Sequence, residues 1–276
     1  MFVGRKKVKG LINFLKGIAV GIATLVPGVS GGTMSIILGI YDDLIHSVSS
    51  FFHDWKKNLI FLGQVALGGL LGMVLLSNVL EEALIKYPFV MKFFFIGVIF
   101  GGLPVLFKKA SGTKSEGKGY IFFAIGFIIV FLMSSEPGSV TTLATTKGIL
   151  SMIFLLIAGF IIAIALILPG ISGSFMLLAL GLYDVTLSAI NTFNIPFLIP
   201  LALGALIGTV ATTKTIEKLL QKYPRKTYML ILGFIAGSIP QVYPGIPTGG
   251  QFFPSIVAIV LGFILIYILG KKESNQ

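Results

Sequence analysis

The stretch LVPGVSGGTMSIILGIYDD, residues 25–43, recurs with little change as LILPGISGSFMLLALGLYD at residues 166–184. Both copies interrupt a long apolar run with the pattern Pro-Gly-x-Ser-Gly, and both close on Gly-x-Tyr-Asp. Proline removes a backbone donor and glycine permits tight reversals, so each copy predicts a break in a helix. This repeated break decides how the chain folds.

The composition indicates a multi-spanning membrane protein. Of 276 residues, 55% are hydrophobic and 11% are charged, and the mean hydropathy is +1.00. Such a chain has too little polar surface to cover a soluble globule. The net charge of +11 lies in short clusters beside apolar stretches, which is typical of contact with anionic lipid head groups and not of nucleic-acid binding. The chain has no cysteine, and no metal or cofactor motif is present, so no cofactor is predicted.

The chain is a tandem duplication. Residues 17–42 and 159–184 are identical at 12 of 26 positions, and residues 61–104 and 197–240 are identical at 17 of 44. Internal repeats of this kind are common in secondary transporters.

Each repeat is predicted to contain one broken apolar segment followed by three membrane spans, so the fold is expected to be all-α. The first repeat, 1–135, has its broken segment near 11–45 and spans near 59–79, 90–107 and 119–135; the second, 149–270, has them near 149–188, 197–213, 228–243 and 254–270.

The basic clusters indicate how the broken segment runs. If its two arms fold back to one face, every basic cluster lies on the cytoplasmic side, as the positive-inside rule requires. If the segment crosses once, the lysines of 108–118 lie outside. A folded-back pair plus three crossings ends on the opposite face, so the second repeat is expected to be inverted relative to the first. Both termini are then cytoplasmic.

The length of the arms favours re-entrant hairpins. An arm of about 16 residues reaches about 24 Å, which is shorter than a hydrocarbon core of about 30 Å. Hairpins that enter from opposite faces would bring their tips together near the midplane. Open backbone at that depth must be buried in protein or line a polar cavity.

The tips are predicted to bind an anion, especially a phosphate. Each outgoing arm is expected to start at the tip with unpaired N–H groups, a positive dipole end and hydroxyl donors, and to run as one rigid element. Small residues also permit close helix packing in membranes, but their duplication at equivalent inverted positions favours a site. The expected substrate-binding residues are Pro27, Gly28, Ser30, Gly31, Gly32, Thr33, Pro169, Gly170, Ser172, Gly173 and Ser174.

These motifs also carry a family resemblance. The blocks VPGVSGGTM … LGIYDDLI and LPGISGSFM … LGLYD, with the KYP stretch that follows each, resemble the polyprenyl-phosphate transporter family over about residues 10–270. The resemblance implies translocation of undecaprenyl phosphate, a carrier lipid of cell-wall synthesis, from the outer to the inner leaflet of a bacterial cell membrane. The residues alone indicate an inverted-repeat transporter of something anionic, so a small-anion carrier or channel stays an alternative.

Inward movement of the lipid phosphate suggests ion coupling. Moving one negative charge against an inside-negative potential costs about 2.3 kcal/mol per 100 mV, and a co-moving proton or sodium ion would offset this cost. The candidate acids are duplicated across the repeats at the margins of apolar segments, where acids more commonly face interfacial water. They are Asp42, Asp184, Glu81 and Glu217.

An enzyme is not expected. The Gly-x-Ser-Gly element of both copies matches the short pattern of intramembrane serine proteases, but such a serine needs a buried base, usually histidine. The two histidines, His46 and His53, lie in one stretch that is predicted to be a charged loop. A protease is therefore the weakest alternative.

Overall fold

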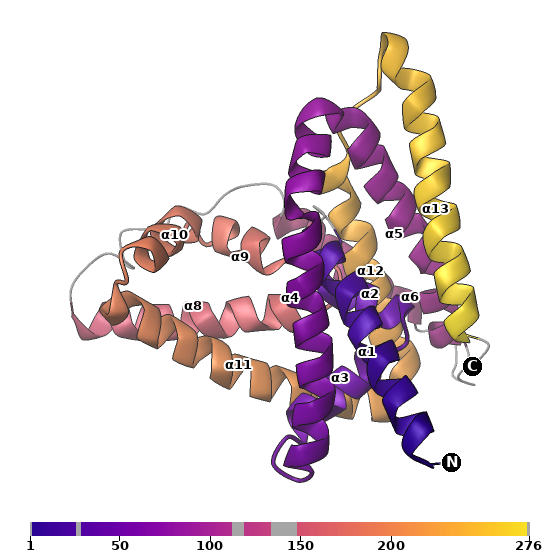
Figure 1. The fold of residues 1–276 in the computed structure, drawn as a ribbon. Coiled ribbons are helices and arrows are strands. Elements are labelled where there is room, and N and C mark those ends of the chain that lie inside the picture. Colours follow the sequence, from indigo (N-terminus) through magenta and orange to yellow (C-terminus); the bar gives the residue numbers. More distant parts are fainter. Residues whose placement is uncertain (1, 26–28, 112–118, 134–147, 275–276) are drawn as a thin grey trace.

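The computed structural model of the chain describes residues 2–25, 29–111, 119–133 and 148–274 (Figure 1). Within these ranges the regular elements are helices, and no strand occurs among them. The elements are α1 (Phe2–Thr24), α2 (Gly31–Ile37), α3 (Tyr41–Ser49), α4 (Trp55–Lys86), α5 (Pro88–Ser111), α6 (Gly119–Met133), α8 (Ile149–Ile167), α9 (Gly173–Ala179), α10 (Tyr183–Asn191), α11 (Ile195–Lys222), α12 (Pro224–Val242), the 3-10 helix η1 (Gly249–Gln251) and α13 (Phe252–Ser274).

Five of these helices are long and apolar enough to cross a membrane, namely α4, α5, α8, α11 and α13, and α6 is a shorter apolar helix. Their outer faces carry many exposed large hydrophobic side chains, among them Leu67 and Leu203, which suit contact with lipid. The predicted all-α, multi-spanning architecture is confirmed for the described residues.

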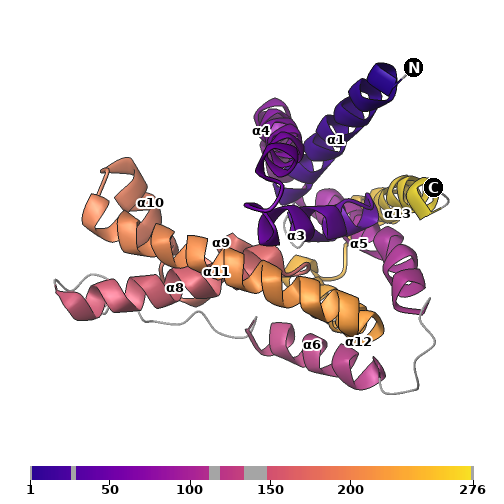
Figure 2. The same ribbon diagram turned by 90° about the horizontal axis from the view of Figure 1, so that it is seen from below.

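The helices α4 and α11 are longer than a bilayer requires. They contain 32 and 28 residues, which correspond to about 48 and 42 Å against a hydrocarbon core of about 30 Å. A long helix fits a bilayer by tilting, and the two run in clearly different directions in both views (Figures 1 and 2). Both helices extend past the predicted spans 59–79 and 197–213, because their polar, charged ends remain helical outside the apolar stretch.

The outgoing arms of the two broken segments are each divided into two short helices. Helices α2 and α9 have seven residues each, and α3 and α10 have nine. Gly39 (φ +68°) and Gly181 (φ +66°) lie in the gaps, and glycine adopts such positive φ values without steric cost at a helix end. The expectation of one rigid outgoing arm is therefore wrong, because Gly-x-Tyr-Asp introduces a second break.

The two halves pack their helices in corresponding pairs. Helix α1 packs on α4 as α8 packs on α11, and α5 packs on α13 as α12 packs on α6. The helices predicted as the third spans, α6 and α13, therefore each lie against the helix predicted as the second span of the other half.

Glycines at matching positions make these crossings close. A Cβ added to Gly68 would collide with the backbone of Phe14 on α1, and one added to Gly204 would collide with the backbone of Leu156 on α8. These two glycines are 136 positions apart. Small residues of this kind let helix backbones approach closely in membranes.

The helix of the first motif, α2, lies in the core of the molecule. Its Ile36 and Ile37 are fully buried, and the Ile37 side chain fills the space beside Gly102 of α5 and Gly270 of α13. This packing fixes the residues that precede α2 in the chain.

Candidate functional site

The two Pro-Gly-x-Ser-Gly motifs lie against each other. The backbone N–H of Gly170 donates to the Oγ of Ser30 at 2.9 Å, and a Cβ added to Gly32 would lie 3.2 Å from the Cα of Pro169. Gly170 has φ +88°, and a Cβ there would lie 2.6 Å from the backbone nitrogen of Ile235 in α12. The structure therefore brings together residues that are 140 positions apart in the chain.

Ser30 joins the two motifs with its hydroxyl group. Its Oγ accepts the N–H of Thr33 at 3.1 Å, which caps α2, in addition to the N–H of Gly170. A hydroxyl oxygen accepts two hydrogen bonds, so the remaining hydrogen is directed to the Oγ1 of Thr33 at 3.0 Å. Both side chains are buried. In this conformation Ser30 therefore uses its full hydrogen-bonding capacity inside the protein.

The second motif has a different local geometry. Ser172 is half-buried and precedes α9, but its side chain makes no capping hydrogen bond to that helix. Of these two serines, which are equivalent in sequence, Ser30 caps the helix that follows it and Ser172 does not.

A cavity of about 720 Å³ lies where the two motifs meet, between α1, α3, α4, α8 and α11. Five of the predicted binding residues line it: Ser30, Gly31, Gly32, Ser172 and Gly173. Its other polar side chains are the hydroxyls of Thr24, Ser35, Tyr41 and Thr213, and no charged side chain is among its described lining residues. The cavity thus offers hydrogen bonds without a fixed positive charge.

The remaining predicted binding residues surround this cavity or cannot be placed. Thr33, Pro169 and Gly170 are buried near it without lining it. Pro27 and Gly28 lie outside the described residues, and Ser174 belongs to the backbone of α9 without a described side chain.

The cavity also reaches the apolar exterior. Its lining includes Leu70 of α4 and Leu166 of α8, and each of these side chains is 56% exposed. Both belong to helices that are apolar enough to span a membrane. Polar groups at the motifs and exposed apolar side chains of candidate membrane-spanning helices therefore share one space, which suits a molecule with a polar head and an apolar tail.

Asp42 joins α3 to two other helices. Its carboxylate accepts from the Nζ of Lys109 on α5 at 3.1 Å and from the hydroxyl of Tyr228 on α12 at 2.9 Å. The sequence did not indicate either partner, because both are far from Asp42 in the chain.

Glu217 joins α11 to α3 in a similar way. It pairs with the Nδ1 of His46 at 2.6 Å and accepts from the Oγ of Ser49. The two other predicted coupling acids, Asp184 and Glu81, are exposed and make no hydrogen bond or ion pair with a described residue. The four acids do not form one site.

The structure gives no support to a serine protease. His46 lies on helix α3 and not in a loop, and its ring contacts Glu217 and Ser50. The described hydrogen bonds of Ser30 go to Thr33 and Gly170, and none of them involves a histidine.

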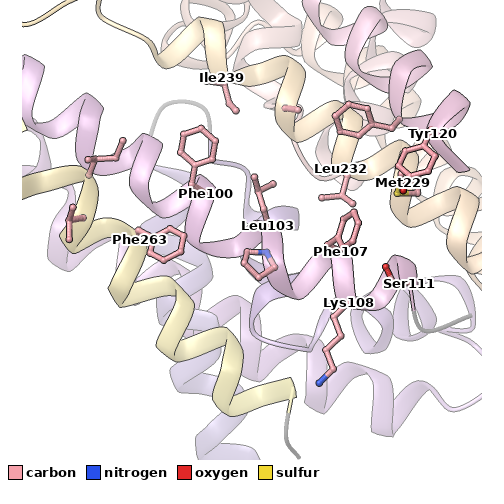
Figure 3. Close-up of a pocket in the computed structure, with 15 residues that line it drawn as sticks. Phe100, Leu103, Phe107, Lys108, Ser111, Tyr120, Met229, Leu232, Ile239 and Phe263 are labelled. Carbon is pink, nitrogen blue, oxygen red and sulfur yellow. The ribbon is translucent and has the colours of Figure 1, made fainter. Parts of the chain in front are cut away.

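A second cavity, of about 1210 Å³, lies between α5, α6, α12 and α13 (Figure 3). Its walls are apolar and include Phe100, Leu103, Phe107, Leu232 and Phe263. Its polar lining residues lie near the end of α5 and the start of α6 and are Lys108, Ser111 and Tyr120. Walls of this kind suit hydrocarbon chains.

Comparison with known proteins gives concordant results. The family model VCA0040-like, described as undecaprenyl phosphate translocase-like, matches residues 20–252. The polyprenyl-phosphate transporter of Staphylococcus aureus (strain NCTC 8325 / PS 47) is 38% identical over 280 residues, which cover 96% of this chain and 98% of that protein. The polyprenyl-phosphate transporter of Vibrio cholerae serotype O1 is 30% identical over 257 residues, or 87% of this chain and 79% of that protein. No solved structure matches the chain.

These comparisons confirm the resemblance that the repeated motif predicted. The family is named for translocation and both relatives are named as transporters, so the prediction that the chain is not an enzyme is confirmed. Both relatives are bacterial, which agrees with a multi-pass protein of a bacterial membrane. The chain belongs to the undecaprenyl phosphate translocase-like family.

Proposed function

We propose that this protein carries undecaprenyl phosphate or a similar polyprenyl phosphate from the outer to the inner leaflet of a bacterial cell membrane, where the lipid is reused in cell-wall synthesis. The observation that carries the proposal is the cavity that joins the hydroxyls at the meeting point of the two motifs to exposed apolar residues such as Leu70 and Leu166. The names of the family and of both relatives support the same lipid class.

The architecture that we propose for this task is an inverted repeat, in which each half has one re-entrant hairpin and three spans. The matching helix pairs support a common fold of the two halves. Both termini lie in the lower part of Figure 1, as does the turn before α4 that leads into Lys56 and Lys57. By the positive-inside rule, this end of the molecule is cytoplasmic.

The phosphate is proposed to bind at the motif tips. The N–H groups of Gly31 and Gly32, at the start of α2, have no acceptor among the described residues, and hydroxyl groups surround them in the cavity. Helix α2 is short, so its dipole is small, and the local N–H and O–H donors supply the recognition. Ser30 holds this geometry through its bonds to Thr33 and Gly170.

A proton or sodium ion is proposed to move with the lipid. The cavity contains hydroxyl groups but no charged side chain among its described lining residues. A phosphate that leaves water for such a site has no fixed cation to balance it, which is costly. The candidate acids remain Asp42, Asp184, Glu81 and Glu217.

The proposal is tested in vesicles that contain the purified protein and undecaprenyl phosphate in the outer leaflet. Movement of the lipid inward removes it from a membrane-impermeant reagent that binds phosphate. Gly32→Val should lower the rate tenfold or more, equivalent to about 1.4 kcal/mol, because the side chain would press on Pro169. Gly63→Val is the matched control, because a Cβ there meets nothing within 4 Å.

The same vesicles separate lipid transport from the small-anion alternative. Entry of labelled inorganic phosphate without movement of the lipid would show that the substrate is a free anion. We expect the protein to protect the lipid from the impermeant reagent. This protection should be lost with Gly32→Val and kept with Gly63→Val.

A further inference from the structure

The two halves match in sequence but differ in contacts at the two ends of the molecule. Helix α3 packs on α11, whereas the equivalent helix α10 makes no comparable packing on α4 among the described residues. The cavity at the motifs shows the same difference, because α3 contributes Tyr41, Leu44, Ile45 and Val48 to its wall and α10 contributes no described residue.

The tyrosines at the start of these helices are equivalent in sequence and differ in burial. Tyr41 is 3% exposed, and its hydroxyl donates to the carbonyl of Ile167 at the end of α8 at 3.1 Å. Tyr183 is 38% exposed. The aspartates that follow them differ in the same sense, since Asp42 is paired with Lys109 and Asp184 has no described partner.

The glutamates near the ends of the long helices repeat this difference. Glu217 of α11 pairs with His46 and Ser49 of α3. Its equivalent, Glu81 of α4, is exposed, and the positions equivalent to His46 and Ser49 are Ser188 and Asn191 of α10, which are exposed as well. A serine hydroxyl and an asparagine amide are both donors that a carboxylate accepts.

The other half of the chain also contains a possible hydrogen-bond donor for Asp184. The position equivalent to Tyr228, which donates to Asp42, is Lys92 of α5. An ammonium group at that position would give Asp184 a charged donor if α10 approached α5.

We propose that α3 and α10 are the two gates of one transport cycle and that the structure is the state in which the α3 gate is closed. In the opposite state α3 leaves α11 and α10 docks on α4, where Glu81 pairs with Ser188 or Asn191 and Asp184 pairs with Lys92. This inference rests on the proposed function, because it takes the two halves to be inverted copies. Exchange of conformations between inverted repeats opens a central site to the opposite side.

The local structure provides the hinges that such a movement needs. Helix α2 is fixed by its buried residues Ile36 and Ile37, and α3 follows it after the break at Gly39. Helix α10 follows α9 after the equivalent break at Gly181. Rotation at Gly39 moves α3 and breaks the bond from Tyr41 to the carbonyl of Ile167, while α2 keeps its buried contacts.

Cysteine cross-linking tests the proposal directly, because the chain has no cysteine of its own. One reporter pair is His46→Cys with Glu217→Cys, and the other is Ser188→Cys with Glu81→Cys. Each double variant is treated in native membranes with a short bifunctional thiol reagent. Both pairs should cross-link, although only the first is in contact in the structure. Ser188→Cys with Glu82→Cys is the control, because residue 82 faces another side of α4.

Weakening one gate should favour the other. Asp42→Asn removes the charge that pairs with Lys109, and it should raise cross-linking of the Ser188–Glu81 pair about fivefold, equivalent to about 1 kcal/mol. Asp43→Asn, at the neighbouring exposed residue without a described partner, should leave it unchanged. Lys92→Gln should lower cross-linking of the Ser188–Glu81 pair and should not lower cross-linking of the His46–Glu217 pair.

The proposal is overturned if the Ser188–Glu81 pair cross-links no more than its control in every background, while the His46–Glu217 pair reacts fully. The measurement is made with and without added undecaprenyl phosphate. Suppose that both pairs cross-link equally with and without the lipid, and that the vesicles show no lipid transport. This result would support the two gates and would contradict only the proposed substrate.

Discussion

Ser30 accepts two backbone N–H groups and directs its hydroxyl to Thr33, so a phosphate can reach its Oγ only by displacing one of these partners. The N–H groups of Gly31 and Gly32 carry no such cost. We therefore assign Ser30 to holding the two motifs together and the neighbouring backbone to binding the ligand. This division of roles was not visible in the sequence, where Ser30 and Ser172 are equivalent.

The first prediction concerns the hydrogen bonds that Ser30 accepts. Ser30→Ala leaves the N–H groups of Thr33 and Gly170 without a partner, and each buried unsatisfied group costs about 1–3 kcal/mol. Ser77→Ala, on α4, removes only a hydroxyl that donates to the carbonyl of Val74 in the same helix and should cost less. Thermal unfolding in detergent should show the larger loss of stability for Ser30→Ala. Equal losses would mean that the bond between the motifs is unimportant.

The second prediction concerns Gly170. Alanine at φ +88° costs about 1–2 kcal/mol in backbone strain, and its Cβ would also press on the backbone of Ile235. Gly245 has a similar φ of +91°, but a Cβ there meets nothing within 4 Å. Gly170→Ala should therefore lower the unfolding temperature more than Gly245→Ala. A similar decrease in both variants would attribute the effect to strain alone and contradict close packing against α12.

The existence of the apolar helices was predictable from the hydrophobicity and the duplication of the sequence. The apolar spans and the all-α fold follow from composition, and the doubled motif indicated a close approach of its two copies. The break at Gly39 carried a signal that was missed, because a glycine after a short apolar helix is a common helix end. The contact between His46 and Glu217 had no signal in the sequence, since it joins polar residues that are 171 positions apart.

The third prediction tests the glycine crossings between helices. Gly68→Leu and Gly204→Leu should each force a helix pair apart, α1 from α4 and α8 from α11, because the new side chain would meet backbone atoms. Overpacking of this kind costs about 1–3 kcal/mol or more. Gly63→Leu, on the same helix as Gly68 but in open space, should be tolerated. Purified yield and unfolding temperature are the measurements. The close packing at Gly68 and Gly204 would be contradicted if Gly63→Leu lowered both values while Gly68→Leu and Gly204→Leu did not.

The whole molecule exists in one asymmetric state, although its two halves share the same motifs. A sequence repeat predicts that two equivalent arrangements are available, but it does not say which one is occupied. That choice depends on small differences between equivalent positions, such as His46 against Ser188 and Tyr228 against Lys92. Differences of about 1 kcal/mol are enough to shift such an equilibrium several-fold.

The fourth prediction tests the orientation of the whole chain. Ser111, at the end of α5, and Thr248, before α13, are exposed and lie on opposite sides of the membrane in the proposed topology. Single cysteines at these positions should react with an impermeant thiol reagent from opposite faces, and Ser111→Cys should react only after the cytoplasmic face is made accessible. Labelling of both variants from the outside of intact cells would contradict the inverted repeat.

The last prediction concerns the driving force for the whole transport cycle. A monoanionic lipid that moves inward alone works against the membrane potential, which costs about 2.3 kcal/mol per 100 mV, or a factor of about 50 in accumulation. If one proton moves with it, the transported charge is zero, so the potential has no effect and each unit of pH gradient changes accumulation about tenfold, or about 1.4 kcal/mol. Because the cavity has hydroxyl groups and no described charged side chain, we expect this second result. Vesicles in which the potential and the pH gradient are set independently distinguish the two cases, with a sodium gradient as the third condition. Accumulation that follows the potential and ignores both ion gradients would show that the phosphate crosses without a cation.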